Sequence, residues 1–284
     1  MSIVIENLSF TYMKKTPFEK TALKNINLTV NDGELLGIIG ATGSGKSTLI
    51  QHFNGLIPVQ SGKVVVCGED LAQKKPDLKK VRQKVGIVFQ YPEYQLFDET
   101  VAKDIAFGPK NLGLSEEEID KRVKESMALV GLSEEIAEKS PFDLSGGQKR
   151  RVAIAGVIAM RPEILILDEP TAGLDPQGKK DILTLVKKLQ ETCSPTVVMI
   201  SHNMDEISDM ANRIALLHKG ELLACLAPDE LFSREDLVSK AGLELPVSVS
   251  VAKKLKERGI QLPNTPCRKS ELAKIIAEKR RGLC

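Results

Sequence analysis

The sequence predicts an α/β fold with a buried, largely parallel sheet, a helical insertion and a small helical appendage at its C-terminal end. Short apolar runs of strand length recur along the first 235 residues. They alternate with amphipathic helical stretches, as in sheets that are covered on both faces. The runs that carry this prediction are LLGIIG (35–40), KVVVCG (63–68), KVGIVFQ (84–90), EILILDEP (163–170) and TVVMISHN (196–203).

Two regions depart from this alternation. Strand-like runs are missing from about Ser115 to Met160, and Ser115 forms a capping box with Glu118 at the start of a helix. Beyond about Lys240 the sequence predicts two short helices on either side of a proline-containing turn. We therefore expect a domain of residues 1–235 with a helical subdomain at about 92–160, and an appendage of residues 240–284.

Bulk properties narrow the classes of function. The chain has 284 residues and a formal net charge of +2, so we expect no nucleic-acid partner. Its five cysteines include no C-x-x-C pair, which argues against a disulfide framework or a structural zinc site. The start of the chain lacks a signal-peptide pattern, and no segment has the ~20 apolar residues of a membrane-spanning helix.

A glycine-rich segment follows the apolar run LLGIIG and predicts a nucleotide site. GATGSGKST fits the pattern G-x-x-x-x-G-K-[ST]. Gly43 and Gly45 let backbone N–H groups surround phosphate oxygens, and the helix that begins near Lys46 directs its positive end at the same anion. The Lys46 ammonium reaches the β- and γ-phosphates, and the Ser47 hydroxyl ligates Mg²⁺. The nucleotide-binding residues predicted here are Gly40, Gly43, Ser44, Gly45, Lys46, Ser47 and Thr48.

Two adjacent carboxylates end a second apolar run. ILILDEP places Asp168 and Glu169 directly after a strand that the sequence predicts to be buried. Such a strand seldom ends in two acids unless positive charge lies opposite, although a solvated strand end is the alternative. We therefore assign Asp168 to the Mg²⁺ shell and Glu169 to polarising an attacking water.

A third motif, LSGGQKRR from Leu144 to Arg151, completes a set. The set resembles the ATP-binding-cassette (ABC) ATPases over about residues 1–230. The resemblance implies ATP hydrolysis in a head-to-tail dimer. It also implies that Ser145 and Gly147 contact the γ-phosphate of the ATP held by the partner subunit.

The same resemblance assigns four further residues. It makes Gln90 the glutamine that senses Mg²⁺ and the attacking water, and Asp175 the aspartate of the loop AGLDP. It makes His202, after the run TVVMIS, the histidine near the γ-phosphate, although a lone histidine is more often structural. Tyr12 matches the aromatic that stacks on adenine, with simple packing as the alternative. The implied catalytic residues are Glu169, His202 and Gln90, and the implied Mg²⁺ ligands are Ser47, Gln90 and Asp168.

Aromatic side chains gather in one segment of a chain that has no Trp, three Tyr and eight Phe. The segment runs from Gln90 to Pro109. In ABC proteins the equivalent segment forms a groove for a membrane partner, whereas the alternative is a small core under a loop. We expect Phe107 and Ile105 to face inward. The residues expected to line the groove are Tyr91, Tyr94, Leu96 and Phe97.

The segment from Gln90 to Pro109 also matches a narrower family than the ABC proteins as a whole. It resembles the energy-coupling-factor (ECF) importers, whose pattern P-E-x-Q-L-F-x-x-T-V is followed by D-I-A-F-G-P. The insertion MKKTPFEKTAL after Tyr12 resembles the second of the two related ECF ATPases, and the C-terminal appendage matches the part that holds the two ATPases together. The matching residues are Pro92, Glu93, Gln95, Leu96, Phe97, Thr100, Val101 and Asp104 to Pro109.

The resemblance implies an importer of vitamins or transition-metal ions in which this chain binds ATP and Mg²⁺. Its partners would be a second, related ATPase in a heterodimer, a transmembrane coupling protein in the Gln90–Pro109 groove and a substrate-binding membrane protein. Self-pairing of the isolated chain is the alternative to the heterodimer. The location would be peripheral, on the cytoplasmic face of the cell membrane. The alternative functions are the ATPase of a conventional ABC transporter and a soluble ABC-fold ATPase acting on DNA or the ribosome.

Overall fold

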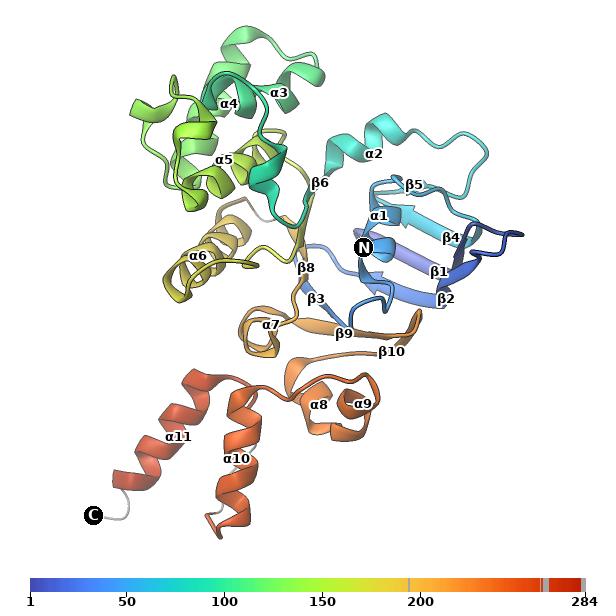
Figure 1. The fold of residues 1–284 in the computed structure, drawn as a ribbon, viewed down its shortest axis with the longest axis vertical. Coiled ribbons are helices and arrows are strands. Elements are labelled where there is room, and N and C mark those ends of the chain that lie inside the picture. The colour runs from blue at the N-terminus through green and yellow to red at the C-terminus, as the bar shows by residue number, and fades with distance from the viewer. Residues whose placement is uncertain (194, 261, 263–265, 282–284) are drawn as a thin grey trace.

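A six-stranded central sheet forms the middle of the molecule, in the order β10-β9-β3-β8-β7-β6 (Figure 1). The computed structural model describes residues 1–193, 195–260, 262 and 266–281. All neighbouring strands are parallel except β10, which pairs antiparallel with β9. The predicted α/β fold is therefore confirmed. The strands are β3 (Leu35–Ile39), β6 (Val85–Val88), β7 (Ile164–Asp168), β8 (Thr196–Ile200), β9 (Arg213–His218) and β10 (Glu221–Leu226).

Both faces of this sheet are buried, which explains why its strands are continuous apolar runs. Successive side chains of a strand point to opposite faces. Leu165 and Leu167 therefore join the core beneath the helices α5, α6 and α7. Ile164 and Ile166 join a second core on the opposite face, around α1.

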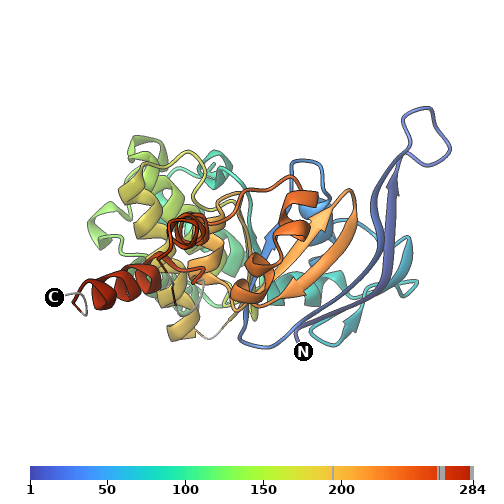
Figure 2. The same ribbon diagram turned by 90° about the horizontal axis from the view of Figure 1, so that it is seen from below.

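A second sheet of four antiparallel strands, in the order β2-β1-β4-β5, covers that opposite face. The run KVVVCG belongs here as β4 and not to the parallel sheet where the sequence placed it. The turn between β1 and β2 projects from the body (Figure 2), and it carries the exposed side chains of Met13 and Phe18. The strands are β1 (Ile3–Tyr12), β2 (Lys20–Val30), β4 (Ser61–Val66) and β5 (Glu69–Asp70).

The helices of the predicted subdomain pack beside the free edge of β6 (Figure 1). Polar side chains cap each of them. The hydroxyl groups of Thr100 and Ser115 accept hydrogen bonds at the starts of α3 and α4, and Ser145 and Gln148 form a full capping box on α5. The elements are α3 (Val101–Asn111), α4 (Glu116–Leu129), α5 (Gly146–Ile158) and the short 3₁₀ turns η1 (Pro92–Gln95), η2 (Glu134–Ile136) and η3 (Pro141–Asp143).

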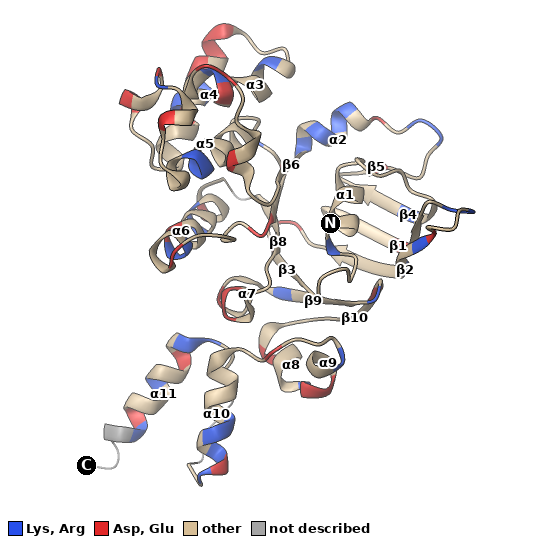
Figure 3. Ribbon diagram, in the orientation of Figure 1, with Lys and Arg blue, Asp and Glu red and all other residues tan. Residues whose placement is uncertain are grey.

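The remaining helices connect the strands or extend from the end of the chain. No helix among the described residues is long and apolar enough to cross a membrane. Figure 3 shows that Lys and Arg gather on α2, which carries no Asp or Glu. The helices are α1 (Lys46–Phe53), α2 (Leu78–Lys84), α6 (Pro176–Cys193), α7 (Met204–Met210), α8 (Pro228–Ser233), α9 (Glu235–Lys240), α10 (Val247–Glu257) and α11 (Lys269–Arg281).

The appendage consists of α10 and α11, the two helices that the sequence predicts, and Pro263 of the turn between them lies outside the described residues. Asp205 of α7 attaches this appendage to the core. Its carboxylate accepts a hydrogen bond from the Val247 backbone at 2.8 Å and pairs with the Lys269 ammonium at 2.9 Å. The start of each appendage helix is therefore held by one residue of the core.

Close packing of the helical subdomain on the sheet depends on glycine in β6. A Cβ on Gly86 would lie 2.5 Å from a methyl carbon of Val157, so Gly86→Ala should lower stability by about 1–3 kcal/mol. Gly156→Ala in α5 is the control, because its Cβ would meet nothing closer than 3.8 Å and alanine favours helix. Thermal unfolding should show a lower midpoint for the first variant only, and equal midpoints would contradict this packing.

Candidate nucleotide-binding and docking sites

The phosphate loop lies between β3 and α1, where the sequence places it. Gly43 and Gly45 have φ angles of 78° and 108°, which side chains other than glycine rarely adopt. The Lys46 ammonium donates hydrogen bonds to the carbonyl oxygens of Gly40 at 2.7 Å and Ala41 at 3.1 Å. The loop is thus folded around the lysine that the sequence assigns to phosphate binding.

One buried polar atom of this loop has no partner. The Ser44 side chain is only 3% exposed, and its Oγ makes no hydrogen bond among the described residues. Buried hydroxyls are nearly always hydrogen-bonded, so this group lacks an acceptor or donor that a ligand can supply.

Three predicted catalytic side chains meet at the carboxyl ends of neighbouring strands. Gln90, Glu169 and His202 follow β6, β7 and β8. The Gln90 side-chain amide donates to Glu169 Oε2 at 3.1 Å, and His202 Nε2 lies 2.9 Å from Glu169 Oε1. Both oxygens of one carboxylate are therefore held, each by a residue from a different strand.

Glu169 has an uncommon backbone conformation. Its φ angle is 50°, in the left-handed region that residues other than glycine seldom adopt. The backbone N–H of Glu169 donates to the carbonyl of Ile200 at 3.0 Å, which continues the ladder between β7 and β8 past the end of β7. Such strain persists where the surroundings over-determine it and gathers at functional sites. Here it turns the carboxylate toward the two strand ends.

Burial shifts the pKa values of two charged groups beside the loop. Desolvation lowers the pKa of Lys46, against the attraction of the carboxylates of Glu169 and Asp168. Desolvation, followed by repulsion from Glu169, raises the pKa of Asp168, against the ammonium of Lys46 and the hydroxyl of Ser47. Two neighbouring acids and one buried cation therefore form a site that favours an added positive charge near Asp168.

Asp168 and Ser47 provide the oxygen donors that Mg²⁺ prefers, and Gln90 adds an amide oxygen nearby. No group of three or more His, Cys, Asp or Glu in the described part of the chain makes a metal site by itself. Mg²⁺ usually takes one or two protein carboxylates and completes its shell with waters and substrate phosphates, so Asp168 and Ser47 could hold it.

Sequence reasoning missed a residue that joins two of these loops. Glu206 of α7 is buried, and its Oε2 accepts hydrogen bonds from the hydroxyl groups of Thr171 at 2.7 Å and Ser201 at 3.0 Å. Thr171 lies in the loop that begins with Glu169, and Ser201 directly precedes His202. The only sequence signal was an acid in the first turn of a helix, which by itself indicates a favourable interaction with the helix dipole.

The other predicted nucleotide contacts lie apart from this cluster. The Tyr12 hydroxyl lies 3.1 Å from Thr48 Oγ1, so this ring stands beside the start of α1. Ser145, Gly147 and Asp175 are exposed, and none of them hydrogen-bonds to the phosphate loop among the residues that the structure describes.

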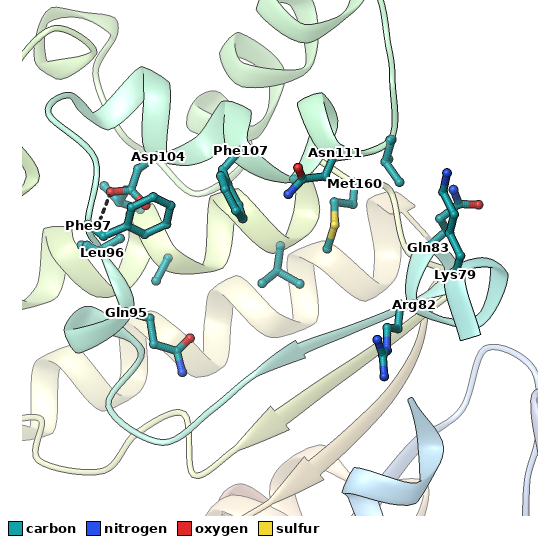
Figure 4. Close-up of a pocket in the computed structure, with 16 residues that line it drawn as sticks. Lys79, Arg82, Gln83, Gln95, Leu96, Phe97, Asp104, Phe107, Asn111 and Met160 are labelled. Carbon is teal, nitrogen blue, oxygen red and sulfur yellow. Dashed lines mark hydrogen bonds between the residues drawn. The ribbon is translucent and has the colours of Figure 1, made fainter. Parts of the chain in front are cut away.

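A groove of about 600 Å³ lies between α2, the segment after η1 and α5 (Figure 4). Phe97 and Phe107 lie on one side of it, with ring centroids 5.0 Å apart. Phe107 was expected to face inward, but it is 48% exposed and lines the groove, whereas Ile105 on the other side of α3 is fully buried as expected. The prediction missed this because the helical period alone does not show which face of α3 has a neighbour.

Two tyrosines that were expected to line the groove do not. Tyr91 and Tyr94 are exposed and contact each other, with ring centroids 6.1 Å apart, outside the groove. Leu96 lines it but is 7% exposed, so it belongs largely to the core. Arg82 stands on the opposite wall, on α2 (Figure 4). The groove thus has aromatic side chains along one wall and basic ones along the other.

Comparisons with known proteins identify the family of the chain. Residues 23–172 match the ABC transporter family. The chain is 54% identical to the energy-coupling factor transporter ATP-binding protein EcfA2 of Caldanaerobacter subterraneus subsp. tengcongensis, over 93% of this chain and 92% of that protein. It is similar in structure to cbiO1 from Clostridium perfringens, part of the ABC transporter complex cbiONQ, with a TM-score of 0.74, 35% identity and coverage of 90% and 98%.

A second solved structure shows a dimer. It is the ATP-binding cassette MJ0796 in a post-hydrolysis state bound to ADP and Pi, with a TM-score of 0.70, 33% identity and coverage of 80% of this chain and 98% of that one. The fold and the phosphate loop thus define an ABC-type ATPase. Within that class, the chain belongs to the ATP-binding subunits of ECF transporters. This sets aside a conventional ABC transporter and a soluble ABC-fold ATPase.

The raised pKa of Asp168 predicts a stability effect in the nucleotide-free chain. The charged form is disfavoured in the folded state, so the carboxylate lowers stability above its raised folded pKa and has no such effect below its ordinary, unfolded pKa. Asp168→Asn should therefore raise the thermal midpoint at neutral pH in the presence of a chelator. The gain should shrink as the pH falls and vanish in strong acid.

The exposed carboxylate of Asp143 provides the control, because Asp143→Asn should leave the midpoint unchanged at every pH. A lower midpoint for Asp168→Asn at neutral pH would mean that the attraction to Lys46 outweighs desolvation.

Proposed function

We propose that this chain powers an ECF importer by binding ATP with Mg²⁺ and hydrolysing it at Glu169. The observation that carries the proposal is the convergence of Gln90 and His202 on the Glu169 carboxylate, at the strand ends beside the phosphate loop. Gly40, Ser44 and Thr48 complete the phosphate loop around Lys46 and Ser47, as the motif predicts.

The chemistry is in-line attack of water on the γ-phosphate, with catalysis mainly by positioning and electrostatics. The Glu169 carboxylate accepts a hydrogen bond from the water and orients it, while Gln90 and His202 hold that carboxylate in place. Lys46 neutralises charge on the β- and γ-phosphates. Bound Mg²⁺, held by Ser47 and Asp168 with Gln90 nearby, would neutralise the charge that develops on the phosphoryl oxygens.

We propose a head-to-tail dimer as the active form. Ser145 and Gly147 are exposed at the start of α5, where its N-terminal N–H groups are available for a phosphate. They would complete the site of the partner subunit, and Asp175 would face the same interface. Tyr12 would stack on the adenine of the chain's own ATP. The partner would be the second, related ECF ATPase, and the 240–284 appendage would help to hold the two together.

We further propose that the groove receives a helix of the transmembrane coupling protein. Its aromatic wall suits the apolar face of an amphipathic helix, a common mode of recognition. A separate membrane protein would bind the vitamin or metal ion that is transported. This arrangement would place the chain on the cytoplasmic face of the cell membrane.

The proposed role of Glu169 predicts that its replacement slows ATP hydrolysis but leaves ATP binding intact. Glu169→Gln should lower kcat roughly 10²–10⁴-fold while ATP binding is preserved, because the amide cannot act as a general base. Phosphate release measures the turnover, and light scattering with ATP should detect a trapped dimer. Lys46→Ala is the control, since it should lose ATP binding instead. Turnover of Glu169→Gln near that of the unaltered chain would contradict the proposed base.

If the groove binds the coupling protein, removing its aromatic side chains should weaken assembly with that protein and leave the chain folded. Phe97→Ser with Phe107→Ser should weaken binding of the detergent-solubilised coupling protein about 30-fold or more, as expected for the loss of central aromatic anchors. The thermal midpoint should change little, because both rings are about half exposed. Tyr94→Ser removes an exposed ring outside the groove and should bind normally. A collapsed midpoint would show instead that the two rings act as core.

A further inference from the structure

Arg150 of α5 is buried, and every arm of its guanidinium is hydrogen-bonded. The side chain is 2% exposed. Its Nε and Nη2 donate to the two carboxylate oxygens of Glu93 at 3.1 and 2.8 Å, which is the bidentate geometry of strong arginine–carboxylate pairs. Its Nη1 donates to the carbonyl oxygens of Pro170 at 3.0 Å and Ala172 at 2.9 Å.

These contacts join three segments that are far apart in the sequence. Glu93 lies in η1, directly before the residues that line the groove. Arg150 itself lies in the helix whose start carries Ser145. Pro170 and Ala172 lie in the loop directly after Glu169. One side chain thus touches the docking segment, the signature helix and the loop next to the proposed base.

The loop after Glu169 is held from two sides. Arg150 binds the carbonyls on either side of Thr171, and Glu206 of α7 binds the Thr171 hydroxyl from the other side. Because the loop has no partner strand beyond Glu169, these contacts fix where the left-handed turn at Glu169 points. A change in the position of Arg150 therefore acts directly on that turn.

Burial of a charge is costly unless it is fully paired, so this arrangement needs a functional reason or a structural one. We propose that Arg150 is a positioning residue for ATP hydrolysis. Through its hydrogen bonds to Glu93 and to the carbonyls of Pro170 and Ala172, it fixes the position of the loop after Glu169 relative to η1. The proposal rests on the proposed role of Glu169. A displacement of η1 beside the groove would then move the loop after Glu169 through Arg150.

The neighbouring arginine provides a matched control. Among the described residues, Arg151 donates to the carbonyl of Val130 and pairs with Asp181 of α6, and neither of these partners lies in η1 or in the loop after Glu169. Lysine keeps the charge at either position, but its single ammonium group cannot serve a carboxylate and two separate carbonyls in the arginine geometry. Arg150→Lys therefore breaks contacts with η1 and with the loop after Glu169, whereas Arg151→Lys leaves those contacts intact.

The test measures ATP turnover of the full-length chain in its purified transporter complex. Arg150→Lys should lower kcat roughly 10- to 100-fold, the size expected when a reacting group is misplaced by about 1 Å, with the KM for ATP within about 2-fold. Arg151→Lys should keep kcat within about 2-fold. Equal kcat in the two variants, or a raised KM with kcat unchanged in Arg150→Lys, would overturn the positioning role.

Glu93→Gln tests the same link from its other end and serves by itself if Arg150→Lys does not fold: it should lower kcat with KM unchanged. Where both single variants fold, combining them should cost little more than either change alone, because the pair acts as one unit. Fully additive losses would overturn the proposed link. Glu169→Gln in the same assay keeps the proposals apart: if it is slow while Arg150→Lys turns over normally, only the role of Arg150 falls.

Discussion

The carboxylate of Glu169 is the point on which the geometry of the site depends. Val88 of β6 aligns with Leu167 of β7, and Asp168 aligns with Ile200 of β8, so the three strands end at one level of the sheet. The side chains that follow them therefore meet without any loop having to fold back. Parallel pairing, buried on both faces, supplies this precision because a slip of one residue would exchange the side chains that pack in the two cores.

The helix α5 connects this edge to the docking groove. Its N-terminal end is the signature motif, and its later residues, including Gly156 and Val157, form a wall of the groove. Close contact at Gly86 fixes the helix against β6. The groove wall and the loop after Glu169 are thus joined through α5, a single helix whose start carries Ser145 and whose Arg150 binds that loop.

Much of the fold could be predicted because its signals are local. The phosphate loop, the paired acids after ILIL and the cap at Ser115 each need only a few neighbouring residues. The antiparallel sheet could not be foreseen, because the apolar pattern of KVVVCG identifies a strand but not its partner. The contacts of Arg150 and Glu206 were missed for the same reason: Arg150 reaches Glu93 across 57 residues and Glu206 reaches Thr171 across 35, and nothing nearby distinguishes either side chain from a solvated charge.

The helix α7 gives the C-terminal appendage a physical connection to the catalytic edge. Asp205 holds the starts of α10 and α11, while Glu206, the next residue, holds the loops that carry Glu169 and His202. Consecutive residues of a short helix cannot move independently. An interaction that displaces the appendage therefore also acts on the turn of α7 that holds the loops of Glu169 and His202, alongside the contacts of the appendage with α8 and α9.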